Sequence, residues 1–438
     1  MLRTRSAEAP DRSAGEVTDE VTAGNATRSG VARPWQAGFV PELVAIAEQL
    51  LAPVPGGTGR YTRELLRAMA ATTPPGWRLT SVVSRGGDPG AVVVDGVEGP
   101  RVLRLPRRAL VAAWERGVPL WPGGDSVHAM TPLAPPPRRG HRLVVTVHDT
   151  VPWTHPETLT PRGVAWHRRA IARAARTADA IVVPTTAVAT ELAQHVDLRA
   201  EVHVIGEGVT PSVIADHPHS SDARPSDARP SDARPSEAHS SEAHPADPRP
   251  RDTDDRIAAR LELPPRYVLA VGTIEPRKGH ADLVRALSLP GAPDVPLLVV
   301  GRQGWGGVDL HALAAEHGLS PGRVRVLGGL DDADLAVVLR RASALAAPSL
   351  AEGFGLPVLE AMAAGVPVVH SDAPALVEVA GGAGVTVPRS DPAALAEALR
   401  VVVAEPDPQR IEAGRRRASA CTWERAAREV WRLHTETP

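Results

Sequence analysis

Two adjacent cations supply the best anion-binding candidate of the chain. Arg277 and Lys278 stand directly before a helix that is predicted to begin near His280. The free N–H groups and the dipole of a helix N-terminus attract anions, and the two side chains add positive charge and hydrogen-bond donors. The pattern indicates a phosphate site, and a solvated, charged helix start is the alternative that this segment leaves open.

Lys278 is also the only lysine of the 438 residues, because arginine supplies all the other basic side chains among the 49 Lys and Arg. In an arginine-rich chain, a single lysine could remain by chance. The composition fits equally a position that needs a compact ammonium group in place of a planar guanidinium.

Two glutamates eight positions apart form a second candidate. Glu352 is expected in the loop after a strand over 344–347, and Glu360 in a helix that begins near Pro357. A carboxylate offers two oxygen acceptors and therefore suits a diol. Ser349 and Glu352 also match a capping box, but a helix that begins at Pro357 leaves this box poorly placed.

The glycines between the two glutamates favour close contact between backbone and ligand. Gly353 and Gly355 carry no side chain, so the backbone can approach a bound molecule closely. Phe354, Gly355 and Leu356 would then offer their N–H groups at the start of the helix.

The first half of the chain holds two weaker candidates. The glycine-rich turn 56–59 follows a short apolar run over 43–47, and His148 and Asp149 follow a buried-strand run over 143–147. Residues at strand ends are well placed to form a site. A plain strand-to-helix connection and a structural histidine are the respective alternatives.

These candidates follow strands of a repeated strand–helix pattern. Continuous apolar strands separated by helices favour parallel sheets covered on both faces, and such sheets bind ligands at the carboxyl ends of their strands. The predicted fold class is α/β, with two doubly wound domains. Strands are expected over 43–47, 143–147, 180–183, 202–205, 267–271, 297–300, 323–327, 344–347 and 366–370, and helices over 60–70, 162–178, 280–287, 310–317, 333–341, 357–364 and 423–434.

A low-complexity segment separates the two halves. Ser-Asp-Ala-Arg-Pro occurs three times over 221–235, and a short period rich in Pro, Ser and charge cannot bury a core. The helix over 423–434 could cross back onto the first domain. The predicted organisation is a disordered tail over 1–38, a first domain over 39–215, a linker over 216–255 and a second domain over 256–438.

Composition narrows the setting. A net charge of −2 and a pI near 6.8 give no reason to expect nucleic acid as a partner. The single cysteine, Cys421, can form neither an internal disulfide nor a cysteine cluster for a metal, which fits the reducing cytoplasm.

No apolar stretch reaches the length of a membrane span. The basic helix over 162–178 could meet an anionic lipid surface or a phosphate-bearing acceptor, or form a solvated face, so the inner face of the membrane stays open as a location.

The segments 271–287 and 347–369 together resemble the donor-binding motifs of the retaining GT-B glycosyltransferases of family 4, also called group 1. The pattern of two glutamates separated by seven residues, Glu352 and Glu360, carries the resemblance. It covers roughly residues 42–432, apart from the linker, and implies two Rossmann-like domains that face a central cleft.

The resemblance also implies roles for the charged candidates. Arg277 and Lys278 would bind the donor diphosphate and stabilise it as it leaves, which suits their charge. Glu352 would accept hydrogen bonds from the transferred sugar and Glu360 from the ribose of the nucleotide. His148 would contact the donor sugar.

The remaining donor contacts implied by the resemblance are backbone positions. A glycine stands at 329, at or near which the family often has an aromatic residue, so the nucleotide base stays open. The implied contacts are Gly57 in the loop that faces the phosphates, Gly328 in the base-contacting loop, and Phe354, Gly355 and Leu356 over the sugar and phosphate.

The activity implied is transfer of a sugar, with retention at the anomeric carbon, from a nucleotide diphosphate sugar to a hydroxyl of a glycan or lipid-linked acceptor. The sequence of residues 273–278 resembles that of mannosyl- or rhamnosyl-transferring members of the family and favours GDP-mannose as the donor. We expect no cofactor and no catalytic metal. Two Asp-x-Asp pairs are discounted, because Asp332–Asp334 begins a predicted helix and Asp252–Asp254 lies in the predicted linker.

Other functions remain compatible with the same motifs. A sugar-nucleotide epimerase or a phosphorylase would use the same fold, although a phosphorylase would usually need a pyridoxal-phosphate lysine, and Lys278 already has a predicted place on the diphosphate. A non-catalytic nucleotide-sugar-binding protein is the alternative from another class. Oligomeric state is not predicted.

Overall fold

The computed structural model describes residues 40–214 and 250–436, which belong to one compact unit. The predicted tail over 1–38 and most of the predicted linker over 216–255 lie outside the described residues. Helix α7, Pro250–Arg260, begins within the last residues of that predicted linker. Asp254 of the discounted Asp252–Asp254 pair is therefore on a helix, where both carboxylate oxygens accept 2.8 Å hydrogen bonds from Arg340.

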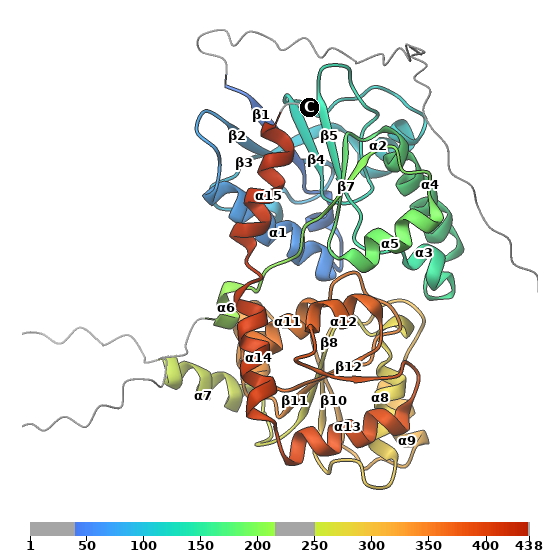
Figure 1. The fold of residues 1–438 in the computed structure, drawn as a ribbon, viewed down its shortest axis with the longest axis vertical. Coiled ribbons are helices and arrows are strands. Elements are labelled where there is room, and N and C mark those ends of the chain that lie inside the picture. Colours follow the sequence, from blue (N-terminus) through green and yellow to red (C-terminus); the bar gives the residue numbers. More distant parts are fainter. Residues whose placement is uncertain (1–39, 215–249, 437–438) are drawn as a thin grey trace, which may run out of the picture. The chain divides into compact units, whose positions relative to one another are not determined.

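Two all-parallel sheets with helices on their faces make up the described residues, which confirms the predicted α/β class (Figure 1). The inner strands of each sheet are short, largely apolar runs with side chains buried on both faces, as is typical of parallel sheets, whereas the edge strands are more exposed. The first sheet has the order β3-β2-β1-β4-β5-β6-β7, with β1 Glu42–Ile46, β2 Arg78–Arg85, β3 Glu98–Pro106, β4 Ser126–Ala129, β5 Arg142–Thr146, β6 Ala180–Val183 and β7 Glu201–Val204.

The second sheet repeats the arrangement. In each sheet the strand order reverses beside a central strand, β1 in the first and β8 in the second, and ligands of doubly wound sheets bind at this reversal. The order is β10-β9-β8-β11-β12-β13, with β8 Val268–Val271, β9 Leu297–Val300, β10 Val324–Gly328, β11 Ala344–Ala347, β12 Val368–Ser371 and β13 Val385–Val387.

The longer helices alternate with the strands as far as the last strand, after which three helices follow one another to the end of the described residues. The longer helices are α1 Gly56–Ala71, α2 Arg107–Glu115, α4 Pro161–Thr177, α5 Thr186–His195, α8 His280–Ser288, α9 Leu310–Glu316, α10 Asp332–Arg340, α11 Leu356–Ala363, α12 Pro374–Ala380, α13 Pro392–Ala404, α14 Pro408–Ser419 and α15 Trp423–Thr435; α3 Val151–Thr154 and α6 Pro211–Ile214 are single turns.

The glycine-rich segment 56–59 is helical, and its prediction as a turn is wrong. Helix α1 begins at Gly56, whose φ of 61° is open to glycine at little cost. The chain therefore enters the helix four residues earlier than expected. Gly59 sits so close to Pro55 that a β-carbon there would lie 2.2 Å from the proline Cβ, which explains the second glycine.

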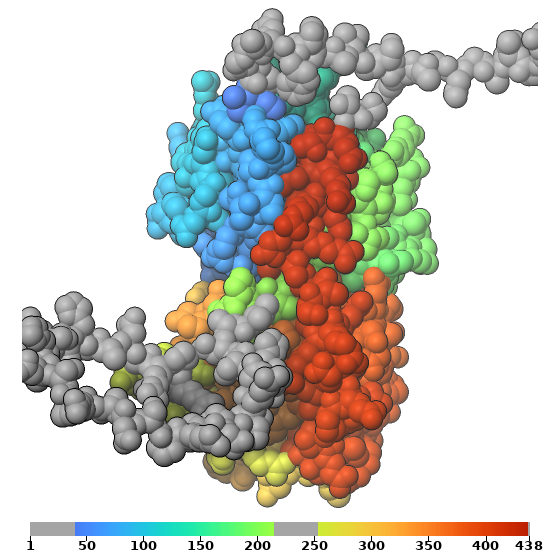
Figure 2. Space-filling model, turned by 60° about the vertical axis from the view of Figure 1, so that its left-hand side comes forward, coloured from blue at the N-terminus to red at the C-terminus, as the bar shows by residue number. Residues whose placement is uncertain are grey.

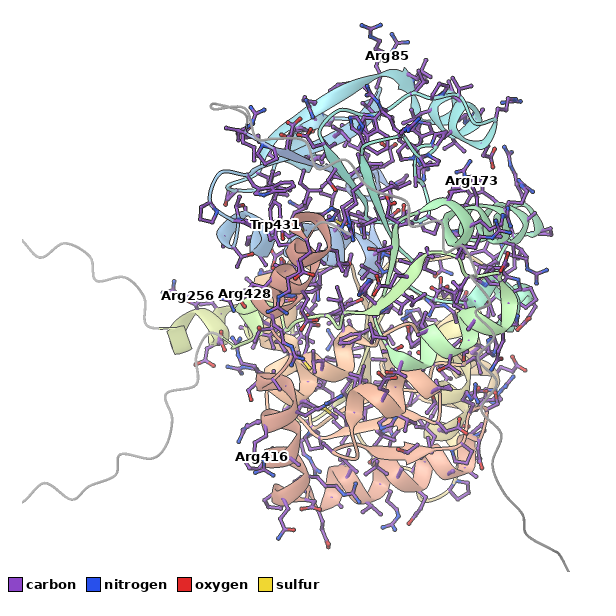
Figure 3. The ribbon with its side chains drawn as sticks, turned by 45° about the horizontal axis from the view of Figure 1, so that its top comes forward. Arg85, Arg173, Arg256, Arg416, Arg428 and Trp431 are labelled. Atoms are coloured by element: carbon purple, nitrogen blue, oxygen red, sulfur yellow. The ribbon has the colours of Figure 1, made fainter. Side chains whose placement is uncertain are left out.

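The last helix, α15, packs against the first sheet's helix α1. Trp431, labelled in Figure 3, is buried and donates a 2.9 Å hydrogen bond from its indole Nε1 to the carbonyl of Met69. Figure 2 shows this red segment lying along blue residues of the first half. One buried apolar cluster accordingly contains Leu65 of α1, Val430 of α15 and Leu359 of α11.

Candidate donor-binding site

Lys278 and Arg277 grip the same carboxylate. The ammonium of Lys278 donates to Glu352 Oε1 at 2.6 Å, and Arg277 donates from Nη1 to Glu352 Oε2 at 3.0 Å. Ser349 donates to Oε1 at 2.7 Å. The amide of Leu350 donates to the carbonyl of Arg277 at 2.8 Å, which ties the loop after β11 to the short turn Pro276–Lys278 after β8.

The electrostatics of this cluster favour charge on Glu352. Burial would raise the pKa of Glu352, but the charges of Lys278 and Arg277 outweigh it and lower the pKa to about 2. The side chains are only partly enclosed, with 15 % of Lys278 and 12 % of Glu352 exposed. The charged cluster thus joins two loops at the point where the strand order of the second sheet reverses, and the carboxylate of Glu352 is ionised before a ligand binds.

Arg277 and Lys278 differ in how many of their N–H donors remain free for a ligand. The guanidinium of Arg277 donates to Glu352, to the carbonyl of Ala351 and, through Nε and Nη2, to Glu275. An arginine has five N–H donors, so Arg277 is nearly saturated by the protein. Lys278 donates to Glu352 alone among the described residues and keeps two of its three N–H donors. A bound anion would therefore find its free donors mainly on Lys278.

Glu360 lies on α11 and is held from the first half of the chain. Arg60 of α1 donates from Nη1 to both of its oxygens, at 2.9 and 3.1 Å, and Thr210 donates to Oε1 at 2.7 Å. Burial raises the pKa of Glu360, and Arg60 and Thr210 oppose this effect. Arg60 also pairs with Asp332 at 2.9 Å. Sequence reasoning missed Arg60 and Thr210, since no local pattern connects residues so far apart.

His148 meets the glutamate loop directly. A β-carbon on Gly353 would lie 1.8 Å from the carbonyl oxygen of His148, so only glycine allows this approach. The ring donates from Nε2 to the carbonyl of Met130 at 2.8 Å. Burial lowers the pKa of His148, which this hydrogen bond and Asp149 oppose. A neutral ring protonated on Nε2 leaves Nδ1 as an acceptor, which suits a sugar hydroxyl.

A buried chain of hydrogen bonds lies behind His148. Tyr61 packs edge-on against the ring of His148 at 4.7 Å and shares a 3.2 Å hydrogen bond with Thr146. Thr146 in turn bonds His128 at 2.9 Å, His128 bonds His434 at 3.1 Å, and His434 bonds Ser126 at 2.6 Å. The chain runs from α15 through β4 and β5 to α1.

The backbone candidates Phe354, Gly355 and Leu356 stand at the start of α11. Gly355 precedes the helix with a φ of 105°, which favours glycine. Among the described residues no acceptor is found for the three N–H groups at 354–356. These amides are therefore available to a ligand beside Glu352.

Gly57 and Gly328 are less closely joined to the cluster. A β-carbon on either residue would meet nothing within 4 Å, so both border open space. The neighbouring Gly56 faces Thr273, with its β-carbon position 4.0 Å from Thr273 Oγ1. The helix start with Gly57 thus faces the loop that carries Lys278, whereas no described contact joins Gly328, with a φ of 72°, to that loop.

Several charged residues of the basic helix and of the Asp-x-Asp pair bind other parts of the protein. Arg173 of α4, labelled in Figure 3, donates to the carbonyls of Trp114 and Ala134. Asp334 pairs with Arg260, as Asp332 does with Arg60. No group of three His, Cys, Asp or Glu side chains suited to a metal is present in residues 40–214 and 250–436. Within the same ranges no helix is long and apolar enough to cross a membrane.

Two family models cover both halves of the chain. The model described as Glycosyltransferase Family 4 matches residues 55–213, and the model described as Glycosyl transferases group 1 matches residues 252–417. The first contains His148 and the second contains Lys278, Glu352 and Glu360. The chain belongs to the group 1 glycosyltransferases of family 4. The predicted family is confirmed.

Solved structures show the same architecture as this family 4 member. A sucrose-phosphate synthase from Thermosynechococcus elongatus superposes with a TM-score of 0.63 at 22 % identity, over 90 % of this chain and 98 % of that one. WaaG, a glycosyltransferase involved in lipopolysaccharide biosynthesis, superposes with a TM-score of 0.61 at 17 % identity, over 90 % and 100 %. The predicted GT-B fold of two Rossmann-like domains is confirmed.

Curated relatives match more closely over shorter stretches. O-antigen chain mannosyltransferase B of Escherichia coli is 41 % identical over 28 % of this chain and 33 % of its own length. Phosphatidyl-myo-inositol mannosyltransferase of Mycobacterium tuberculosis is 38 % identical over 40 % of this chain and 50 % of its own length. The family 4 chain therefore spans about a third to a half of the curated relatives that it matches.

Proposed function

We propose that this chain is a retaining glycosyltransferase that moves mannose from a nucleotide diphosphate sugar to a hydroxyl of a glycan or lipid-linked acceptor. The observation that carries the proposal is the pair of loops in which Lys278, with two free N–H donors, stands beside Glu352 and the open amides at 354–356. Mannose is supported by the names of the curated relatives, which are mannosyltransferases.

Each group has a role in the proposed reaction. The acceptor oxygen forms a bond to the anomeric carbon while the bond from that carbon to the diphosphate oxygen breaks, and the leaving oxygen takes the electron pair. Lys278 stabilises the charge that develops there. Glu352 and Nδ1 of His148 accept hydrogen bonds from sugar hydroxyls, and Glu360 accepts from the ribose. The departing phosphate takes the acceptor proton on the same face of the sugar, so no further base or metal is required.

The setting proposed is the cytoplasm, at the inner face of the membrane when the acceptor is lipid-linked. No cofactor takes part beyond the donor itself.

A donor screen followed by product analysis tests this proposal. Thermal unfolding with UDP-, GDP-, dTDP- and ADP-sugars should single out GDP-mannose, because a bound ligand stabilises the native state by mass action. Transfer to an alkyl mannoside and to phosphatidylinositol vesicles should then give an α-linked product by NMR. A β-linked product would overturn retention, and failure of every donor to bind or react would overturn the enzyme assignment.

A further inference from the structure

Glu207 is a carboxyl without a partner inside an otherwise paired site. It follows β7, and 6 % of its surface is exposed. In the described parts of the chain no hydrogen bond or ion pair reaches it. By contrast, Glu352 is held by Lys278 and Glu360 by Arg60. An unpaired, ionised carboxylate costs several kcal/mol to bury, so this group either holds a proton or has a ligand as its partner.

The backbone on both sides of Glu207 lies against other elements, most tightly at Gly208. A β-carbon on Gly206 would lie 3.6 Å from the ring of Phe354, and one on Gly208 would lie 2.2 Å from the amide nitrogen of Trp423. Three residues after Glu207, Thr210 bonds Glu360. Because the segment is anchored at these points, Glu207 is held among the elements that carry the donor-site residues.

Two carboxylates and two uncharged aromatic residues face Glu207. Burial raises the pKa of Glu207 to about 8, with further contributions from the carboxylates of Glu360 on α11 and Glu352 after β11. From α1, the ionisable group is Tyr61, whose own pKa Glu207 helps to raise. Trp423 at the start of α15 is uncharged. Burial and the two facing carboxylates therefore disfavour a negative charge on Glu207, whereas Tyr61 and Trp423 are uncharged at neutral pH.

We propose that Glu207 is a further ligand-binding residue of the donor site, where its protonated carboxyl donates a hydrogen bond to an oxygen of the donor diphosphate. This inference rests on the proposed function. The diphosphate joins the ribose, assigned to Glu360, to the transferred sugar, assigned to Glu352, and the charges of both glutamates raise the pKa of Glu207. An ionised carboxylate there would repel the diphosphate, whereas a carboxylic acid kept neutral by its surroundings can donate a hydrogen bond.

Two variants distinguish the effect of the hydrogen-bond donor of Glu207 from the effect of the size of its side chain. Glu207→Gln keeps an N–H donor and is neutral at every pH, and Glu207→Met keeps the length without a donor. GDP-mannose and UDP-glucose are titrated into each protein by calorimetry between pH 6.5 and 9. Wild-type affinity should fall as pH rises through 8, whereas that of Glu207→Gln should stay level. Glu207→Met should bind about 10- to 100-fold more weakly than wild type at pH 7, the range for a lost hydrogen bond to a charged group.

Stability of the free protein provides the second readout. Glu207 binds a proton in the native state up to about pH 8 but releases it near pH 4.5 when unfolded, so wild type should lose stability relative to Glu207→Gln as pH rises between these values. Glu201→Gln is the same substitution at the exposed start of β7 and should change neither measurement. Equal pH profiles for wild type and Glu207→Gln would overturn this inference while leaving transfer activity intact. Absence of donor binding in all the proteins would instead overturn the proposed function.

Discussion

At the scale of the residue, the site depends on how protons and charges are shared between Arg277 and Lys278. The protein itself uses most of the donors of Arg277 to hold Glu275, Ala351 and Glu352 in place. Lys278 keeps its donors for a ligand. Although the two adjacent residues carry the same formal charge, Arg277 stabilises the loop, whereas Lys278 is available to bind the diphosphate.

Replacement of Lys278 tests this division. Lys278→Met should lower kcat by about 10²- to 10³-fold, equivalent to roughly 2.7–4 kcal/mol of lost transition-state stabilisation. Lys278→Arg should rescue little, because the stem is confined by Gly272, whose β-carbon position lies 3.2 Å from Lys278 Cε, and a planar fork does not replace an ammonium. Steady-state kinetics would measure both, with Arg285→Gln on the exposed face of α8 as the control that keeps wild-type turnover.

At the scale of the element, the loops after β5 and β11 meet through a contact that has no room for a side chain. Gly353 accepts a 3.0 Å hydrogen bond from Thr185 through its carbonyl, and its α-carbon faces the backbone of His148. The functional groups of two distant segments are thus held together by main-chain packing, which residue types alone do not reveal.

The pair Gly353→Ala and Gly57→Ala tests this contact. Gly353→Ala should destabilise the fold and lower transfer, because its β-carbon would lie 1.8 Å from the carbonyl oxygen of His148. Gly57→Ala meets open space within α1 and should raise the free energy of unfolding by about 0.5–1 kcal/mol. Denaturant unfolding compares them, and a Gly353→Ala protein as stable as wild type would contradict the packing described.

The elements differ in how well the sequence predicts them. Strands β6, β9 and β11 match their predicted bounds because they are apolar runs buried on both faces. Strand β3 was not predicted, since it lies at the sheet edge and is mostly exposed, and β4 was missed because it carries Ser126 and His128.

The site divides in the same way. The proximity of Lys278 and Glu352 could be predicted, because each residue follows a strand of the same parallel sheet and belongs to a recognisable local motif. Arg60, Thr210 and Glu207 were not, because their importance arises only when the two halves of the chain fold together.

At the scale of the whole molecule, the C-terminal helix is bound to the first sheet by buried histidines. Burial lowers the pKa of His128 to about 3, with a smaller effect of His148, and lowers the pKa of His434, with smaller effects of His128 and Arg142. Both rings are therefore neutral in the native protein and would have to be charged against their surroundings in acid.

This arrangement predicts acid sensitivity in a defined window. The unfolded chain binds protons on these histidines below about pH 6.5, whereas the native protein does not, so the free energy of unfolding should fall as pH decreases from 6.5 toward 4.5. Glu352, with a native pKa of about 2, adds its own loss only below about pH 4.5. Thermal unfolding of wild type and His434→Gln across pH 5 to 8 measures the slope, which should be shallower in the variant. Equal slopes would show that the histidine chain is not responsible.

The solitary lysine gives the protein an unusual chemical property. Its only ε-amino group lies beside Glu352 in the candidate site, so a reagent that acylates ε-amines can label one position and no other of that kind. Mass spectrometry of Lys278 then becomes a direct gauge of occupancy, because a bound diphosphate would shield that amine while the rest of the surface offers no competing lysine. Acetylation or carbamylation, reactions that most proteins spread over many side chains, would here act as a single switch on one functional group.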